Sequence, residues 1–322
     1  MKSSKTREEL IKLYINSLEE GIIPWEKMWE TSEPRNAVTG ESYKGINNLY
    51  LSYIAYKRGY KDNRWCTYLQ KKNNNWKFKG NVEGQGINIE FWKVYCKSEK
   101  KNYNRIEYER IIKKHPERKD DFYLYSVNYI VFNGDLIEGL PELKIDSKEI
   151  VSNEYINNII DNLGVKYDEY GNEAYYNYNE DKVVLPPRKN FKNDYAYYST
   201  QLHELAHASG HISRLNRNLQ TKDREEYAKE ELKAEISSSF FMQKLNLEYD
   251  ENHLINHKSY IQSWLKILKD KPLELFKAIS DANKIVNYLE DKSFIKSKNE
   301  INNEEVLNNK NNIEKEEELY EK

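Results

Sequence analysis

One short motif in the sequence is typical of a catalytic metal site. His203, Glu204 and His207 form the pattern His-Glu-x-x-His. Residues four apart lie on one face of an α-helix, so both imidazoles can face one metal ion. The glutamate between them is placed to take a proton from a metal-bound water. Because the chain has only six histidines, a chance match to this motif is improbable.

A catalytic zinc site needs a third protein ligand besides the two histidines. A metzincin-type extension would place a third histidine at position 213, which is Ser213, so that arrangement is excluded. The segment 225–245 contains no Pro or Gly and is predicted to be a helix, with Glu231 and Glu235 on one stripe. We predict Glu231 as the third ligand and Glu235 as the outer carboxylate that orients a histidine, with Glu235 as the substitute ligand.

Two alternatives to this ligand set remain open. The other face of the second helix alternates acids and bases, and we expect it to be solvated: Glu226, Lys229, Glu230 and Lys233. If the whole helix is a plain charged surface helix, it supplies no ligand. His211 could serve instead if the motif helix continues past Gly210, which we expect to end it. Otherwise His211 is a polar group near the substrate.

Length and cysteine usage limit the class of protein. A chain of 322 residues is long enough for two domains with separate cores. Cys66 and Cys96 have neither metal-type spacing nor a disulfide framework, so we expect a reducing, cytoplasmic location. No apolar run approaches the length of a membrane span, and residues 1–21 are typical of an amphipathic helix rather than a signal peptide. We therefore expect no membrane association.

Charge and aromatic residues are distributed unevenly along the chain. Residues 1–140 hold 25 Lys and Arg against 19 Asp and Glu, whereas residues 141–322 hold 26 against 34. Five of the six tryptophans also lie in the first half. Basic residues neutralise phosphates and aromatic rings stack on unpaired bases, so this half favours single-stranded nucleic acid over duplex. The alternative is that the aromatics fill a small core and the lysines solubilise it.

The hydrophobic pattern predicts a chain of mixed α+β class. In the first half we expect helices at 5–20 and 48–58, strands at 77–95 and 122–132, and a basic loop or hairpin tip at 97–121. In the second half we expect a helix at 153–163, then strands at 164–168, 174–178 and 182–185 that form a small antiparallel sheet. The two site helices follow, then helices at 254–269 and 272–290 and a disordered polar tail.

Several ordered motifs resemble those of the ArdC-type antirestriction proteins. They are Ile23-Pro24-Trp25, Pro34-Arg35-Asn36 with Thr39-Gly40, Tyr43-Lys44-Gly45-Ile46-Asn47, Trp65-Cys66-Thr67-Tyr68-Leu69-Gln70, Val131-Phe132-Asn133, Tyr197-Tyr198-Ser199-Thr200 and Arg214-Leu215-Asn216-Arg217. Members of that family join an N-terminal domain that binds single-stranded DNA to a C-terminal zincin-like metallopeptidase domain. The resemblance covers nearly everything from residue 10 to residue 290. The chain departs from it at 81–85, where the family has a short basic glycine turn, and in the insertion at 97–121.

The resemblance implies a domain organisation and a set of partners. It predicts a DNA-binding domain at 1–135, a linker at 136–150, a zincin-like domain at 151–292 and a tail at 293–322. The candidate DNA contacts are Trp25, Arg35, Asn36, Thr39, Tyr43, Lys44, Asn47, Trp65 and Gln70. It further implies a protein of a plasmid, phage or conjugative element that protects incoming DNA, with zinc as the metal, manganese as its alternative, and an unknown host protein as the peptidase substrate. The competing hypothesis is a non-catalytic DNA-coating protein whose metal domain is structural or binds proteins.

Overall fold

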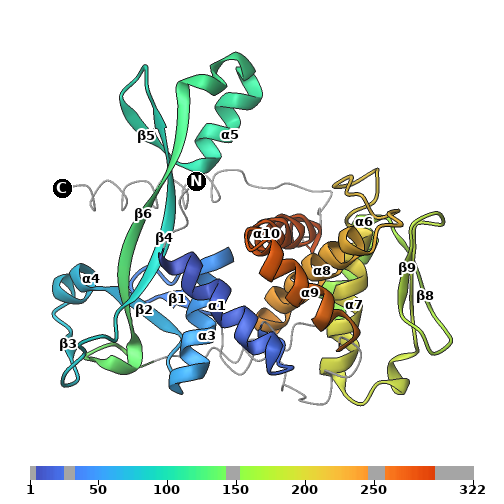
Figure 1. Ribbon diagram of the computed structural model, residues 1–322, viewed down its shortest axis with the longest axis horizontal. Coiled ribbons are helices and arrows are strands. Elements are labelled where there is room, and N and C mark those ends of the chain that lie inside the picture. The colour runs from blue at the N-terminus through green and yellow to red at the C-terminus, as the bar shows by residue number, and fades with distance from the viewer. Residues whose placement is uncertain (1–4, 25–32, 143–152, 246–257, 294–322) are drawn as a thin grey trace.

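The computed structural model describes residues 5–24, 33–142, 153–245 and 258–293. The chain forms two lobes that contact each other, one built on a β-sheet and the other mainly on helices (Figure 1). The fold is therefore α+β, as predicted. Among these described residues no helix is long and apolar enough to cross a membrane. The predicted polar tail at 293–322 lies outside the described residues except for Ser293.

The first domain is a five-stranded sheet flanked by helices. The strand order is β1-β2-β6-β4-β5, with β1 parallel to β2 and the other neighbours antiparallel. Its elements are α1 (Lys5–Glu19), β1 (Arg35–Asn36), α3 (Gly45–Arg58), β2 (Arg64–Thr67), α4 (Tyr68–Asn73), β3 (Lys77–Phe78), β4 (Ile87–Cys96), β5 (Lys101–Tyr103), α5 (Arg105–Lys114), the 3-10 helix Pro116–Asp121, and β6 (Phe122–Asn133). The helices predicted at 5–20 and 48–58 and the strands predicted at 77–95 and 122–132 are confirmed.

β4 and β6 form a long ribbon that extends beyond the rest of the sheet (Figure 1). They pair from Ile87 opposite Val131 to Cys96 opposite Phe122. The segment 97–121 at its end is not a loop, because it contains β5, α5 and the 3-10 helix. Asn104 and Glu107 cap α5 reciprocally. The apolar residues of this helix and of β5 pack against Val94, Cys96 and Phe122 of the ribbon; they are Tyr103, Tyr108, Ile111 and Ile112.

The first domain continues into the segment predicted as a linker. After the 3-10 helix Gly134–Leu136, β7 (Ile137–Glu138) pairs antiparallel with β3. Ile137 of β7 is buried. The domain therefore extends to Glu138, a few residues past the predicted boundary at 135, because a two-residue strand leaves no periodic signal in the sequence.

The second domain places a small sheet beside a helical bundle. Its elements are α6 (Asn153–Leu163), β8 (Lys166–Glu169), β9 (Tyr175–Asn177), β10 (Lys182–Leu185), the 3-10 helix Arg188–Asn190, α7 (Asp194–Ala208), α8 (Arg224–Leu245), α9 (Lys258–Asp270) and α10 (Glu274–Ser293). The sheet order is β8-β10-β9. The sheet is mixed rather than wholly antiparallel, because β10 runs parallel to β8 and antiparallel to β9. α6 packs against α10.

The two domains share one core instead of having the separate cores expected from chain length. A single cluster of buried apolar side chains runs from α1, α3 and the sheet into α7, α8, α9 and α10. Polar contacts cross the same junction. Arg7 of α1 donates to Glu90 of β4 at 2.9 Å, and its guanidinium lies 4.8 Å from the ring of Phe276 in α10. Gln243 of α8 donates to the hydroxyl of Ser52 in α3 at 3.2 Å.

Candidate metal centre

α7 carries the histidine motif on its inner face. The helix begins where the Asn193 side chain accepts a hydrogen bond from the amide of Ala196 at 2.9 Å. One turn apart near its C-terminal end, His203 and His207 point their Nε2 atoms at each other, 3.1 Å apart. Two donor atoms at this distance on one helix face can share a single cation.

α8 brings a carboxylate to the same point. Glu231 is buried, and its two oxygens lie 3.5 Å from Nε2 of His203 and 3.4 Å from Nε2 of His207. Within the described part of the chain, these three residues are the one cluster of His, Cys, Asp and Glu found with metal-ligand geometry, with donor atoms within 4.8 Å of one another. The two helices are held together nearby, where Ser238 donates to the carbonyl of Ser199 at 2.9 Å. Two imidazoles and one carboxylate are a donor set that fits a catalytic zinc ion.

Each histidine also faces a second buried carboxylate. Nδ1 of His203 lies 3.2 Å from Oε1 of Glu235, which is the arrangement predicted for Glu235. Nδ1 of His207 lies 3.6 Å from Oε1 of Glu230. The prediction that Glu230 belongs to a solvated face is wrong, since it is only 5% exposed. Such outer carboxylates fix the orientation and tautomer of ligating imidazoles.

Glu230 is held in place by Arg217, from the segment that connects α7 to α8. The Arg217 guanidinium donates to Oε1 of Glu230 at 2.8 Å, to the Ser209 hydroxyl at 2.9 Å and to the Ala206 carbonyl at 2.7 Å. Gly210 makes room for this contact, because a Cβ there would lie 2.9 Å from the guanidinium carbon. The close approach of Arg217 therefore explains the glycine. The periodic pattern of the helix could not predict this contact, because Arg217 comes from a different segment.

Burial and charge set the protonation of the centre. Burial lowers the pKa of His207, but the carboxylates of Glu230 and Glu231 outweigh it and raise that pKa to about 9. His203 shows the same balance, with its pKa raised by Glu235 and Glu231 against the effect of burial. Burial raises the pKa of Glu231, but hydrogen bonds from both histidines bring it well below its usual range. A cation that binds here therefore has to displace protons from the imidazoles.

Glu204 lines the pocket next to these groups. It is buried, and this burial raises the pKa of its carboxyl even though both neighbouring histidines oppose the shift. The pocket has a volume of about 250 Å³ and is bordered by Tyr175 and Tyr176 on one side and Tyr227 and Tyr260 on the other. A carboxyl with a raised pKa beside a metal-binding cluster is suited to exchanging protons near neutral pH.

His211 is not brought to this cluster. α7 ends at Ala208, and the following turn directs the His211 ring toward Tyr178, with ring centroids 4.9 Å apart. Its Nδ1 lies 2.7 Å from the hydroxyl of Ser213 and 4.0 Å from Asp181. The geometry thus places His211 among polar groups at the edge of the site, because the helix does not gain the extra turn that ligation would need.

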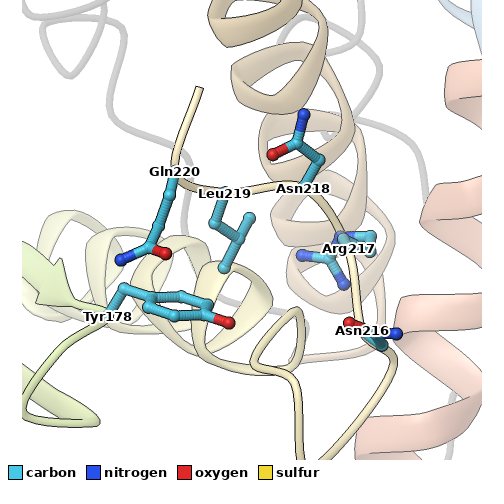
Figure 2. A pocket seen from close by; sticks show the side chains of 6 residues that line it. All are labelled: Tyr178, Asn216, Arg217, Asn218, Leu219 and Gln220. Carbon is cyan, nitrogen blue, oxygen red and sulfur yellow. The ribbon is translucent and has the colours of Figure 1, made fainter. Parts of the chain in front are cut away.

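A second cavity, of about 270 Å³, lies beside the first. It is lined by Tyr178 and by the connecting segment, from which Leu219 and Gln220 project toward the tyrosine (Figure 2). Tyr178, Asn218 and Leu219 line both cavities. The connecting segment therefore forms a wall of the metal-site pocket as well as carrying Arg217.

The candidate DNA contacts fall into two groups by burial. Arg35, Thr39 and Lys44 reach the surface of the loop that precedes α3. Asn36 organises this loop, since its Oδ1 accepts from the amides of Val38 and Thr39 at 2.9 and 3.1 Å. The exposed group is therefore presented by a loop of fixed shape.

The other candidates are largely enclosed. Trp65 is fully buried, and Asn47 exchanges hydrogen bonds with the backbone of Glu90 at 2.8 and 3.0 Å. Tyr43 is also buried, and Gln70 caps α4 while contacting Asn36. These side chains hold the loop against the sheet in this conformation. Trp25 lies outside the described residues.

Comparison with known proteins identifies both domains separately. Residues 4–132 match a family described as the N-terminal domain of the anti-restriction factor ArdC, and residues 154–281 match a zincin-like metallopeptidase family. A zincin-like domain implies a metal ion, in agreement with the donor cluster on α7 and α8. The order of the two matches is the order of the two domains in the fold.

The chain is similar to two crystal structures of the antirestriction ArdC protein from the R388 plasmid. The metal-free structure has a TM-score of 0.70 at 28% identity and covers 90% of this chain and 98% of that one. The Mn(II)-bound structure has a TM-score of 0.69 at 29% identity, with 90% and 99% covered. A protein named DNA primase TraC from Escherichia coli is 35% identical over 294 residues. These are 88% of this chain but 20% of that protein, so the chain spans about a fifth of its length.

Proposed function

Since the chain belongs to the ArdC-type antirestriction family, we propose that it binds single-stranded DNA through its first domain and carries a zinc-dependent peptidase centre in its second. The observation that carries the second part is the convergence of His203, His207 and Glu231 beside a buried Glu204. We take these three as the metal ligands. Two nitrogen donors and one carboxylate suit zinc better than manganese, which prefers oxygen ligands.

The residues around the ligands have distinct roles in this proposal. When bound, the metal lowers the pKa of a water molecule and so supplies a nucleophile near neutral pH. Glu204 would be the residue that takes up a proton at this site, a role for which its raised pKa is suited. Glu235 and Glu230 orient the imidazoles of His203 and His207. Burial raises the pKa of Glu230, but the hydrogen bond from His207 and the charge of Arg217 together bring it to about 2, so this carboxyl stays ionised.

The small sheet offers a place for a protein substrate. β9 is an edge strand, with β10 as its neighbour in the sheet, and it contributes to the lining of the metal-site pocket. Tyr175 and Tyr176 of β9 line that pocket together with His203 and Glu204. An extended peptide can therefore add to this edge and present a peptide bond to the metal site. We propose a host protein that acts on entering DNA as this substrate, in the cytoplasm, where the buried free thiols of Cys66 and Cys96 remain reduced.

The test is the Glu204→Gln variant in cells that restrict incoming DNA. Transfer of an unmodified plasmid is measured in a restricting host that carries wild-type protein, the variant, or the control Glu226→Gln. Glu226 is an exposed acid on α8 whose nearest cation is Lys229, at 2.6 Å. We expect protection to be lost with Glu204→Gln and kept with the control, while the zinc content of the purified proteins stays equal.

A non-catalytic protein that coats DNA is the second candidate function. It is favoured by the way the donor cluster joins α7 to α8, because a metal ion there would also stabilise the bundle. This candidate predicts that chelation lowers the melting temperature while Glu204→Gln protects as well as the wild type. Partners recovered uncut on the metal domain would instead indicate a protein-binding module.

A further inference from the structure

One face of the β4–β6 ribbon carries a row of exposed rings. The two residues of a cross-strand pair place their side chains on the same face of the ribbon, and successive pairs alternate between its two faces. The row consists of Phe91, Tyr95, Tyr123, Tyr125 and Tyr129, which we call the aromatic row. Phe91, Tyr123 and Tyr129 are 43%, 45% and 39% exposed. An exposed aromatic patch of this extent usually marks a binding surface.

The rings of the aromatic row form two contacting groups. The ring centroids of Phe91 and Tyr129 are 5.5 Å apart in a T-shaped arrangement. Those of Tyr95 and Tyr123 are 5.3 Å apart, and those of Tyr123 and Tyr125 are 6.0 Å apart. Mutual packing limits the motion of each ring, so the row is pre-organised for a partner that stacks.

The opposite face of the ribbon is covered at one end by β5 and α5. Val94, Cys96 and Phe122 are buried on that face by β5 and α5. This small core at the end of the ribbon forms without the aromatic row, while Trp92, Leu124 and Ile130 on the same face are 36%, 45% and 52% exposed. The exposure of the aromatic row is a separate feature of the fold.

The row continues the loop that holds the exposed DNA candidates. The ring of Tyr43 makes a T-shaped contact with Phe91, with centroids 6.5 Å apart. Tyr43 belongs to the loop that presents Arg35 and Lys44 at the surface. From Phe91 the row extends four residues along β4 to Tyr95, roughly 13 Å at the usual rise of a strand. The buried ring of Tyr43 thus joins the loop to the Phe91 end of the row.

The charge of this surface favours an anionic partner. At the positions on β4 and β6 that share the face of the row, the only ionisable side chain besides the tyrosines is Lys93, the cross-strand partner of Tyr125. Residues 93–133 as a whole hold ten Lys and Arg against six Asp and Glu, a net charge of +4. A second copy of the chain would bring Lys93 against another cationic face. A polyanion with exposed rings of its own is complementary to both the charge and the aromatics.

We propose that the aromatic row is a stacking platform for the unpaired bases of single-stranded DNA, with Lys93 contacting the phosphate backbone. This rests on the DNA binding proposed above and locates it on one face of the ribbon. Duplex DNA keeps its bases stacked on each other and cannot use the rings in this way. The loop with Arg35 and Lys44 contacts the backbone as the strand leaves the row.

The test uses the full chain and a fluorescein-labelled oligothymidylate of about 15 nucleotides, a length within the range of known single-strand sites. Anisotropy gives the dissociation constant for Phe91→Ala, Tyr123→Ala and Tyr129→Ala. We expect each to bind about ten- to a hundredfold more weakly, the loss that follows from removing one stacked ring. Tyr129→Phe keeps the ring and is expected to bind within about twofold of the wild type.

Leu124→Ala is the matched control. Leu124 is 45% exposed, adjacent to Tyr123 on β6, and its side chain lies on the other face of the ribbon. We expect its dissociation constant to equal that of the wild type. Lys93→Ala is expected to reduce the slope of log affinity against log salt by about one, as for the loss of one phosphate contact. Equal melting temperatures would exclude unfolding as the cause of any loss.

The outcomes separate the two proposals. If the wild type does not bind the oligonucleotide, the proposed function itself fails. If the wild type binds and the three ring variants bind as well as Leu124→Ala, DNA binding stands and the aromatic row is not its surface. If the ring variants bind DNA normally but convert a dimer to a monomer in sedimentation, the row belongs to a second copy of the chain and the proposal is overturned.

Discussion

Replacing Glu235 by Gln should weaken metal binding without removing a ligand. Glu235 lies 3.2 Å from Nδ1 of His203, and both side chains are nearly enclosed. A metal ion on Nε2 leaves the proton on Nδ1, and the carboxylate of Glu235 can accept a hydrogen bond from this N–H group. The amide of Gln has a similar shape but no charge, so it holds the imidazole less firmly. The expected change is in metal affinity rather than in fold.

The magnitude follows from two opposing effects. A hydrogen bond to a charged group contributes about 1.5–3 kcal/mol, of which a neutral amide keeps part, so zinc affinity should fall about ten- to a hundredfold. Glu235 also raises the pKa of His203 in the metal-free protein, so its removal relieves competition by protons. This second effect partly offsets the loss at pH 7 and fades as the imidazoles deprotonate. The loss should therefore be larger at pH 9 than at pH 7.

Zinc affinity is measured by competition with a chromogenic chelator at both pH values. Glu226→Gln, on the exposed side of the same helix, is the control and should bind zinc as the wild type does. Equal zinc affinity for Glu235→Gln and the control at pH 9 would refute the orienting role of Glu235. A loss confined to pH 7 would contradict the sign of the proton competition.

Three further outcomes are expected. Gly210→Ala should lower the free energy of unfolding, measured by urea denaturation, by about 1–3 kcal/mol, because the new Cβ would lie 2.9 Å from both Arg217 and Leu219. An unchanged free energy of unfolding would mean that these side chains shift freely. Zinc binding at pH 7.5 should release protons, because the pKa of His207 is about 9 without metal, and zinc affinity should rise with pH up to that value. Identical calorimetric heats of binding in buffers of different ionisation enthalpy would contradict this proton release. Thermal unfolding should occur in one calorimetric transition, since the domains share a core, and two separated transitions would count against the shared core.

Residue spacing in the sequence predicted those parts of the site whose geometry is fixed within a single helix. The spacing of His203 and His207 follows from the α-helical repeat, and so does the stripe that carries Glu231 and Glu235. Glu230 could not be placed in this way. Its burial comes from the packing of α8 against α7 and from Arg217, which reaches it from a connecting segment with no periodicity.

The first domain shows the same limit. Trp65 and Tyr123 are both aromatic residues of a basic region, yet one is buried in the core and the other is 45% exposed. Composition cannot distinguish them, because Trp65 on β2 belongs to the core that both domains share, whereas Tyr123 lies on the ribbon face opposite to α5. The sequence pattern did not predict α5, because charged residues surround its apolar positions. Strand direction in the small sheet likewise left no signal, since β8 and β10 become parallel only through the path of the chain between them.

The most direct test of the central claim is anomalous diffraction from crystals of the full chain grown with zinc. One strong peak is expected at the zinc edge, about 2.0–2.2 Å from Nε2 of His203, Nε2 of His207 and a carboxylate oxygen of Glu231. Glu231→Ala crystals should lose most of that peak. A peak bound by other residues, or wild-type crystals with these three side chains intact and no anomalous signal between them, would contradict metal binding by His203, His207 and Glu231.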